Sequence, residues 1–360
     1  MKVIMLGADR SVKGGVSAMV NNLYEAGLSE KINLVYIGTM VDGSSIRKLL
    51  KAAQALMKFL AELRGADIVH LNMAADASCF RKMIFLALAS AFGKKIVVHH
   101  HGGDFVGFYE ERCSAKMRER IRRSLNKADL FIVLSEYWRL YFEKIVTPEK
   151  IRVQENCVPI PAKAKQDYSG HQAVFLGRLC REKGVGELLE SAERVRRTIP
   201  DFQLVLGGFW EKGNEELQKK AEELSEFVRC PGWVSAEERE RLFAESSVFV
   251  LPTWFEGQPV SLLEAMAAGM CTVSSAVGGI PQVLGETESR TLPCGFDGCG
   301  VMTAAKDVQM LSEVMIRVLT DEGLRESVGK RARQRVEEKY GMTGYIKRLT
   351  GFYDELMKEG

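Results

Sequence analysis

The sequence predicts an α/β protein built from two doubly wound, mostly parallel sheets, each in its own domain. The chain has 360 residues, which is too long for one ordinary domain. Short β-branched runs alternate with helical stretches, which is the pattern of parallel sheets covered on both faces. The alternation stops at residues 151–169, where Pro159 and Pro161 break the periodicity, and then restarts. We therefore expect domains at 1–160 and 161–342, with a helix at 343–360 packing back on the first.

In the first domain the strands are apolar and the helices between them are amphipathic. Strands are expected at 3–6, 34–37, 67–71, 95–99 and 130–134. Gly14-Gly15 opens a helix that ends near Ala26, and residues 46–63 form a long helix. Residues 151–169 are interpreted as a linker.

The second domain repeats the alternation of strand and helix. Strands are expected at 173–176, 203–206, 248–251 and 271–274, with helices at 184–198, 214–224, 236–246 and 260–268. From Asp307 onward the chain is expected to be nearly all helical.

The composition is that of a soluble globular enzyme. Hydrophobic residues make up 46% and charged residues 27%, which excludes disordered and fibrous classes. The longest apolar run, 83–92, is too short to span a membrane. The N-terminus runs straight into a strand without a signal-peptide core. The eight cysteines are scattered, as expected of reduced thiols in a cytoplasm.

The charge is unevenly distributed along the chain. Residues 1–160 hold 24 Lys and Arg against 16 Asp and Glu, a balance of +8. The remainder holds 26 against 31, a balance of −5. A basic half beside an acidic half predicts two domains with different partners.

Residues 255–269 carry the strongest functional signal. Glu256 lies in a loop after an apolar strand, and Glu264 lies two turns into a helix that Pro259 can open. The free N–H groups of a helix start suit a phosphate. Glu264 shares an apolar stripe with Val260 and Ala268, so its carboxylate needs a partner, and sugar or ribose hydroxyls would serve. The alternative is a capped surface helix with an incidental glutamate.

Other polar residues follow the ends of predicted strands, where parallel sheets bind their ligands. Those in the first domain are Gly14, Gly15, His101 and Asp104, and those in the second are Arg178, Lys183 and Glu256. One cleft between the two sheets would collect them all. Arg178 and Lys183 would stabilise the negative charge that develops on a departing diphosphate. The alternative is two solvated cations in a polar loop.

These motifs resemble glycosyltransferase family 4, the retaining GT-B group. The family element Phe-Glu-Gly-x-Pro…Glu-Ala-Met-Ala-x-Gly matches residues 255–269. Further matches are Gly177-Arg178-Leu179 with Lys183-Gly184, Gly14-Gly15, the strand-end His101, Asn156, and Gly278-Gly279-Ile280-Pro281. The resemblance covers nearly the whole chain and is stronger in the second domain. It implies a GT-B architecture, with two Rossmann-like domains facing across a cleft.

The sequence departs from the family pattern at several positions. Cys271, Gln282 and Cys157 replace a proline, an acid and a glycine, and Gly207-Gly208-Phe209 replaces the usual Gly-x-Gly turn. No charged group expected at the diphosphate is lost.

The resemblance implies a role for each site residue. Glu264 would bind the ribose hydroxyls, and Glu256 would contact the donor sugar together with the backbone of Gly257, Gln258, Pro259 and Val260. His101 would hydrogen-bond the donor sugar. Gly15 is assigned to the donor, and Gly14 and Asp104 to the acceptor. Arg178, Lys183, Glu256 and His101 are the predicted catalytic residues.

Residues 99–101 are three consecutive histidines, and alternate side chains on a strand share a face. His99 and His101 together would permit a metal site, which is the less favoured interpretation. No Asp-x-Asp element for a diphosphate-bound metal is present. We therefore expect neither a metal nor another cofactor.

The predicted function is a cytoplasmic, metal-independent, retaining hexosyltransferase of polysaccharide biosynthesis. It would use a nucleotide-sugar, expected to be UDP-linked, and a glycan or lipid-linked glycan acceptor. The alternatives are a catalytically silent GT-B scaffold subunit, a sugar-nucleotide epimerase or hydrolase on the same fold, and a metal hydrolase built on the histidines.

Two basic helical faces of the first domain favour peripheral contact with the anionic inner face of a membrane about as well as simple solvation. They are Arg47, Lys48, Lys51 and Lys58, and then Lys116, Arg118, Arg120, Arg122, Arg123 and Lys127. Nucleic acid is not expected, since no aromatic platform accompanies the charge.

Overall fold

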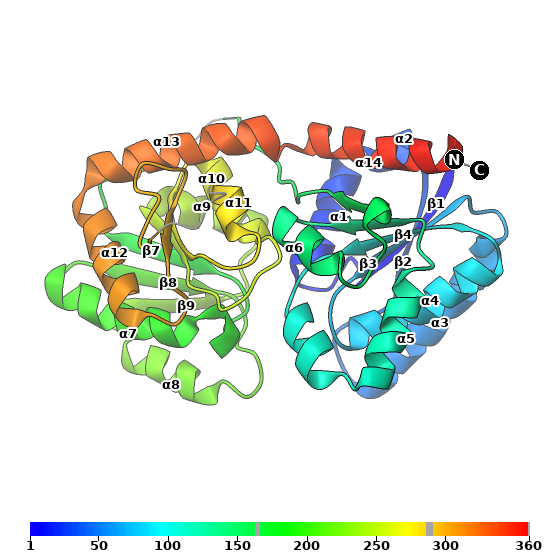
Figure 1. Ribbon diagram of the computed structural model, residues 1–360. Helices are drawn as coiled ribbons and strands as arrows, with labels where there is room; N and C mark the ends of the chain where they lie inside the picture. Colours follow the sequence, from blue (N-terminus) through cyan, green and yellow to red (C-terminus); the bar gives the residue numbers. More distant parts are fainter. Residues whose placement is uncertain (163–165, 286–290, 359–360) are drawn as a thin grey trace. The chain divides into compact units, whose positions relative to one another are not determined.

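A computed structural model describes residues 1–162, 166–285 and 291–358. The chain forms two compact units, one of Met1–Cys157 with Met342–Gly360 and the other of Val158–Gly341. Each unit is an α/β layer structure around one parallel sheet, as the sequence predicts (Figure 1). The sequence analysis had drawn the domain boundary at residues 160 and 342.

The first unit holds a six-stranded parallel sheet with the order β2-β1-β3-β4-β5-β6. The chain reverses its direction of winding between β1 and β3, so their carboxyl ends flank a topological switch point. The strands are β1 (Lys2–Gly7), β2 (Asn33–Gly38), β3 (Ile68–Met73), β4 (Lys95–His100), β5 (Leu130–Val133) and β6 (Ile151–Val153).

Helices cover both faces of this sheet, and a separate hydrophobic core lies under each group (Figure 1). On one face lie α3 (Ser45–Leu63), α4 (Ala77–Ala91), α5 (Ala115–Leu125) and α6 (Glu136–Phe142). On the other lie α1 (Gly15–Glu25), α2 (Leu28–Lys31) and the terminal α14 (Met342–Lys358). A π-helical segment, η1 (Gly107–Arg112), follows β4, and a 3-10 turn, η2 (Pro148–Lys150), precedes β6.

The second unit holds another six-stranded parallel sheet with the order β12-β11-β10-β7-β8-β9. Here the winding reverses between β7 and β10, which places the second switch point at their carboxyl ends. The strands are β7 (Gln172–Leu176), β8 (Gln203–Gly207), β9 (Val228–Gly232), β10 (Val248–Leu251), β11 (Cys271–Ser275) and β12 (Val301–Thr303).

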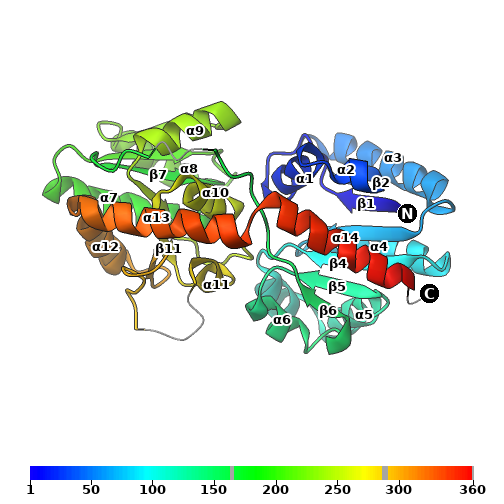
Figure 2. The ribbon, with the colours of Figure 1, turned by 90° about the horizontal axis from the view of Figure 1, so that it is seen from above.

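The helices of this unit enclose one continuous core. Helix α7 (Val185–Thr198) packs with α8 (Glu215–Glu223) and α12 (Val308–Thr320), and α10 (Val260–Ala268) packs with α9 (Ala236–Glu245) and α13 (Glu322–Lys339). Figure 2 shows α13 lying across its sheet. The short α11 (Ile280–Leu284) and the 3-10 turn η3 (Arg181–Lys183) complete the described elements.

Most expected elements are present with their ends shifted by a residue or two, and α10 spans the predicted residues. The expected linker at 151–169 is wrong at its start, because residues 151–153 pair with β5 as strand β6. Strands β9 and β12 were not predicted. Pro259 is the N-cap of α10 and Val260 its first helical residue, so the proline precedes the helix.

The chain enters and leaves the second unit side by side, since Val158 pairs with Gly341 and its N–H donates to the Tyr340 carbonyl over 3.0 Å. Within the described ranges, no helix combines the length and apolar character needed to cross a bilayer.

Candidate functional site

The switch point of the second unit holds an ion pair between two predicted site residues. Lys183 ends the 3-10 turn after β7, and Glu256 lies in the loop after β10. The Lys183 ammonium donates to Glu256 Oε1, and both side chains are only 16% exposed. The structure therefore brings these two residues into direct contact at the place where doubly wound sheets bind ligands.

Glycines set the shape of these loops. Gly184 has φ +71°, and a Cβ there would lie 1.9 Å from the Pro252 carbonyl oxygen. Gly278 has φ +55°, and its Cβ would lie 1.9 Å from the Glu256 carbonyl oxygen. Only glycine fits such close backbone approaches. The loops after β7, β10 and β11 are thus packed backbone to backbone, which fixes the position of Glu256.

Arg178 follows β7 on the same edge of the sheet but is much more exposed than Lys183. Its Nη1 donates to Glu211 Oε2 over 2.6 Å, and the two side chains are 57% and 44% exposed. The guanidinium therefore belongs to a solvent-exposed ion pair. Arg181, which the sequence analysis assigned to solvent, forms an exposed pair with Glu216.

An aromatic pair that the sequence analysis did not single out lies beyond β8 and β9. The rings of Phe209 and Trp233 stack with centroids 5.6 Å apart. Both side chains are exposed large hydrophobics. Each directly follows a Gly-containing strand end, which is the one signal in the sequence that points to them.

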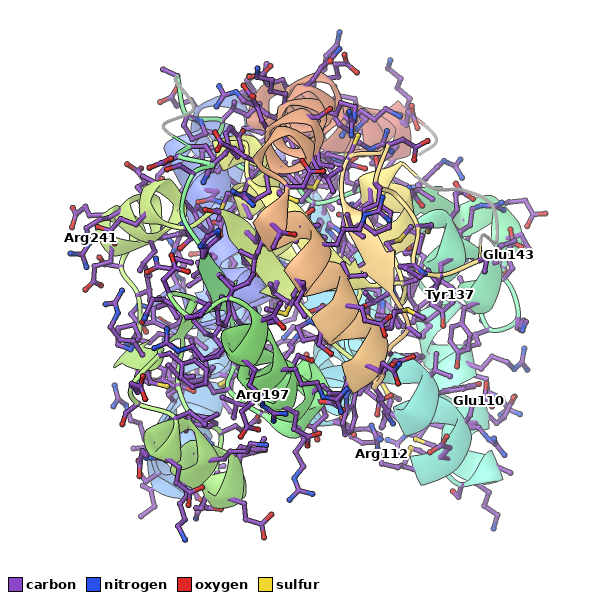
Figure 3. All side chains as sticks on the ribbon, turned by 90° about the vertical axis from the view of Figure 1, so that its left-hand side faces the viewer. Glu110, Arg112, Tyr137, Glu143, Arg197 and Arg241 are labelled. Carbon is purple, nitrogen blue, oxygen red and sulfur yellow. The ribbon has the colours of Figure 1, made fainter. Side chains whose placement is uncertain are left out.

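Glu264 lies on α10, and its carboxylate has a partner within the protein. The partner is Arg239 of α9, whose Nη1 donates to Glu264 Oε1 over 2.7 Å. Burial raises the pKa of Glu264, and the charge of Arg239 opposes that shift. Arg241, two residues further along α9, points outward (Figure 3). Sequence reasoning missed Arg239.

The backbone between the two glutamates is held in place by the loop after β11. The Gly279 N–H donates to the Gly257 carbonyl over 3.0 Å, and Gln258 is buried. Pro259 caps α10 without a side-chain hydrogen bond to the first turn. The first N–H groups of α10, beginning at Val260, therefore receive no side-chain cap from this residue.

The three histidines of the first unit alternate across β4, as predicted. The rings of His99 and His101 stack with centroids 4.3 Å apart, whereas His100 packs against Phe105 and Phe142. His101 Nε2 lies 2.7 Å from Asn72 Oδ1 of β3. Burial lowers the pKa of His101 to about 3, so the imidazole is neutral near pH 7.

Gly14 and Gly15 begin α1 after β1, beside the switch point of the first unit. A Cβ at either position would meet no atom within 4 Å. Neither glycine is therefore required by packing within the protein.

Asp104 belongs to a local structural network. Its carboxylate accepts from Arg112 Nη1 over 2.6 Å and from the Gly107 N–H over 3.2 Å. These bonds hold the start and end of η1 together, and the predicted acceptor contact stays a prediction.

A buried lysine near the same edge was missed by the sequence analysis. Lys82 of α4 is 2% exposed, and its Nζ donates to Thr39 Oγ1 over 2.9 Å. Burial lowers the pKa of Lys82 to about 7. A lysine within an amphipathic helix is usually a surface residue, so the sequence offered no signal.

The described residues contain one cluster with metal-ligand geometry, formed by Cys180, Glu182 and Glu211. Its two glutamates are exposed, and Glu211 is the partner of Arg178. The histidines are not part of it. The expectation of a metal-independent site stays a prediction.

Two family models match adjoining segments of the chain, which together span residues 19–335. The model described as Glycosyltransferase Family 4 matches residues 19–160, and the model described as Glycosyl transferases group 1 matches residues 160–335. The chain belongs to glycosyltransferase family 4. The resemblance inferred from residues 255–269 is thereby confirmed.

Curated relatives match this chain over part of its length. A GDP-mannose:cellobiosyl-diphosphopolyprenol alpha-mannosyltransferase of Xanthomonas campestris is 29% identical to this chain. The match covers 61% of this chain and 58% of the relative. An amylovoran biosynthesis glycosyltransferase of Erwinia amylovora is 25% identical, over 73% and 64%. The chain spans little more than half the length of several such relatives.

Solved structures show the GT-B fold along the whole chain. A sucrose-phosphate synthase from Thermosynechococcus elongatus has a TM-score of 0.79 at 17% identity, with all of both chains covered. HepE of Anabaena in complex with UDP-glucose has a TM-score of 0.74 at 15% identity, covering 99% and 100%. The predicted fold class of two Rossmann-like domains is confirmed.

Proposed function

We propose that this protein is a retaining glycosyltransferase that moves a hexose from a nucleoside diphosphate sugar to a glycan or lipid-linked glycan in polysaccharide biosynthesis. The observation that carries the proposal is the Lys183–Glu256 pair at the switch point of the second unit. A cation and a carboxylate in contact offer one ligand two kinds of partner, namely phosphate oxygens for the ammonium and sugar hydroxyls for the carboxylate.

The reaction breaks the bond between the anomeric carbon and the diphosphate oxygen. Negative charge grows on that oxygen, and Lys183 and Arg178 supply positive charge to it. The exposed guanidinium of Arg178 exchanges Glu211 for the diphosphate at little desolvation cost. The start of α10 adds the partial positive charge of its first N–H groups.

The two glutamates divide the rest of the donor between them. Glu264 accepts hydrogen bonds from the ribose hydroxyls. Burial raises the pKa of this carboxyl group, and the charge of Arg239 opposes that rise by favouring the ionised form. Glu256 accepts from the donor sugar. Because Lys183 already contacts Glu256, this carboxylate is a binding group and not an opposed nucleophile of the kind used by retaining hydrolases.

The acceptor is assigned to the first unit. Its hydroxyl oxygen attacks the anomeric carbon on the face that the diphosphate leaves, and its proton passes to the departing phosphate oxygen. The neutral imidazole of His101, oriented by Asn72, is a hydrogen-bonding partner for a sugar hydroxyl. The open space beside Gly14 and Gly15 supports their assignment to a ligand-contacting loop.

The proposal also has to specify the nucleotide base of the donor. The sequence analysis predicts a UDP-sugar, whereas the Xanthomonas relative is named for GDP-mannose. UDP-linked hexoses and GDP-mannose are therefore the two classes of donor to be compared in one screen.

The screen measures thermal shift and slow donor hydrolysis for each nucleotide-sugar, with Lys183→Ala as the control. The proposal expects stabilisation and nucleotide release with one donor class, both lost in the variant. The anomeric configuration of the product is then read by proton nuclear magnetic resonance. Absence of any donor-dependent shift, or equal behaviour of Lys183→Ala, would favour a silent scaffold subunit.

A further inference from the structure

Helix α3 of the first unit presents an apolar stripe to the outside. Its side chains of Ile46, Leu49, Leu50, Met57 and Leu60 are 43 to 73% exposed. Their spacing of three, four and seven residues places them on one side of the helix. Ala55, Phe59 and Leu63 point the other way and are buried in the core under the sheet. The stripe therefore plays no part in the core of its own unit.

The same helix is basic. Arg47, Lys48 and Lys58 are exposed, and the one carboxylate of α3, Glu62, already pairs with Lys2 over 2.7 Å. An amphipathic helix with an apolar side and a cationic flank is the type that lies in the interface of an anionic bilayer.

A cavity of about 410 Å³ runs along the cationic flank of α3. Arg10, Lys51 and Lys58 line it together with two tyrosines. Its one carboxylate, Asp9, pairs with Lys51 over 2.5 Å. Cations thus outnumber carboxylates in its lining, so the cavity suits an anionic group held next to the apolar stripe.

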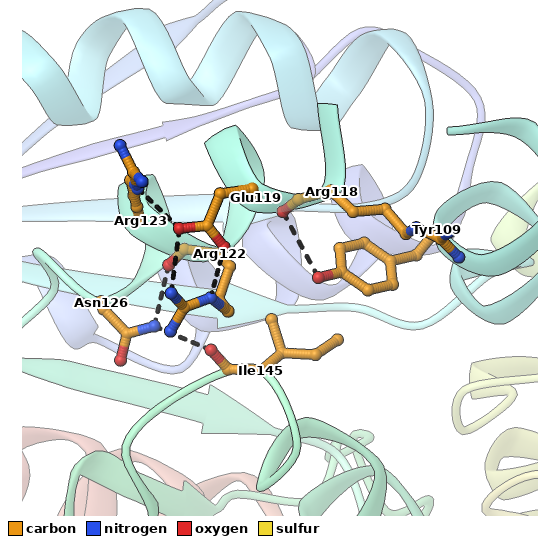
Figure 4. A network of polar contacts seen from close by, with 7 residues as sticks. All are labelled: Tyr109, Arg118, Glu119, Arg122, Arg123, Asn126 and Ile145. Carbon is orange, nitrogen blue, oxygen red and sulfur yellow. Dashed lines mark hydrogen bonds and ion pairs between the residues drawn. The ribbon is translucent and has the colours of Figure 1, made fainter. Parts of the chain in front are cut away.

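Helix α5, the other basic face, differs from α3 in both respects. Arg122 and Arg123 share the carboxylate of Glu119 (Figure 4), and Arg118 pairs with Glu110. No exposed large hydrophobic side chain lies on α5, all of whose residues are described. Its positive charge is partly balanced by the carboxylates of Glu110 and Glu119. It also has no exposed large apolar side chain that could insert between lipids.

We propose that the protein docks on an anionic lipid bilayer through α3, with the stripe in the interface and the cationic flank on lipid phosphates. The proposal rests on the proposed function, because a lipid-linked acceptor is presented at such a surface. A second copy of the chain is a poorer occupant, since two α3 helices face to face would bring Arg47, Lys48 and Lys58 against their own copies.

The experiment is flotation of the purified protein with vesicles of phosphatidylcholine alone and of phosphatidylcholine mixed with phosphatidylglycerol, at low and high salt. The wild type is expected to float with the anionic vesicles at low salt. Leu49→Gln/Leu50→Gln/Met57→Gln should lower recovery about tenfold. Lys48→Gln/Lys58→Gln should lower it and reduce the dependence on salt.

Matched controls separate this surface from others. Ile84→Gln in α4 and Leu140→Gln in α6 remove exposed apolar side chains elsewhere, and Lys116→Gln/Arg120→Gln removes charge from α5. All three should float like the wild type. Leu49→Trp gives a second readout, because its added emission should shift to the blue only with anionic vesicles.

Flotation that survives the triple α3 variant, or that follows the α5 variant, would overturn the proposal. A dimer in gel filtration that the triple variant separates would assign the stripe to a second copy instead. Donor hydrolysis is measured in parallel without vesicles, so loss of the proposed activity with intact flotation, or the reverse, identifies which of the two ideas fails.

Discussion

Four basic side chains near the carboxyl ends of the two sheets have partners of different kinds. In the second unit, Lys183 and Arg239 each contact a carboxylate. In the first unit, Lys82 bonds to the hydroxyl of Thr39 and His101 to the amide of Asn72, and burial lowers the pKa of both side chains. Lys183 and Arg239 therefore contact charged partners, whereas Lys82 and His101 contact uncharged ones.

This difference matches two kinds of ligand. A diphosphate needs cations that stay ionised, and an acidic partner keeps them so until the ligand replaces it. A glycan offers only hydroxyl groups, and neutral hydrogen-bonding side chains bind these without repelling one another. Under the proposed function, the two sheet edges would differ in the partners of their basic side chains because they bind different substrates.

The largest test removes the cations of the second unit. Arg178→Ala and Lys183→Ala are each expected to lower turnover by about 10²-fold or more, since each removes a group that stabilises charge in the transition state. Arg181→Ala, in the same loop but paired with Glu216 in solvent, is the matched control and should turn over normally. Near-normal turnover of a folded Arg178→Ala/Lys183→Ala protein would break the assignment of this edge to the diphosphate.

The next test separates the two glutamates. Glu264→Gln should weaken binding of the bare nucleotide about tenfold, because it removes a charged acceptor from the ribose hydroxyls. Glu256→Gln should weaken binding of the intact nucleotide-sugar only. Calorimetry with the nucleoside diphosphate and with the donor measures both, and equal losses for the bare nucleotide would contradict this division.

A variant of Arg239 tests the role of Glu264 through the pH dependence of nucleotide binding. Arg239→Gln leaves the buried Glu264 without its cation, so the pKa of Glu264 should rise further. As the pH is lowered, nucleotide affinity should therefore begin to fall at a higher pH in the variant than in the wild type. Arg241→Gln, on the outward side of α9, should leave the pH profile unchanged.

A smaller effect is expected from the buried lysine of the first unit. The pKa of Lys82 is about 7 in the folded protein, against 10.5 ordinarily. Between these values the unfolded chain binds more protons, so the free energy of unfolding rises with pH, at roughly 1 kcal/mol per pH unit. Lys82→Met should flatten this rise in urea unfolding between pH 7 and pH 10, whereas the exposed Lys116→Met should keep it. An unchanged slope in Lys82→Met would mean that the lysine stays charged.

The smallest expected effect is that of chelation. Lys183 and Arg178 already provide positive charge for the diphosphate, so EDTA should leave the rate unchanged. A loss that Mg²⁺ or Mn²⁺ restores would point to Cys180, Glu182 and Glu211. Glu182→Gln should then weaken the restoration.

The sequence located Glu256 and Lys183 in loops that follow strand ends, and the direction of winding brings such residues together. The pairing of Arg239 with Glu264 was not predictable, because it depends on how α9 packs on α10. The burial of Lys82 was not predicted, because helical periodicity indicates which side of the helix a residue lies on but not which other elements pack against that side. Strands β6 and β12 span three residues each, too few for an alternating pattern to stand out.

Helix α14 has a consequence for the order in which the protein forms during synthesis. Tyr345, Leu349 and Tyr353 complete the core that also contains Val3 and Ile68, and the Tyr353 hydroxyl lies 2.7 Å from His70 Nδ1. On the ribosome, the part of this sheet face that α14 covers therefore remains exposed until the whole second unit has been translated. The second unit, which is continuous in the chain, can fold before the first is finished. A nascent chain that lacks residues 342–358 would carry a folded second unit and a first sheet with one apolar face partly exposed, and this is the intermediate on which chaperones would act.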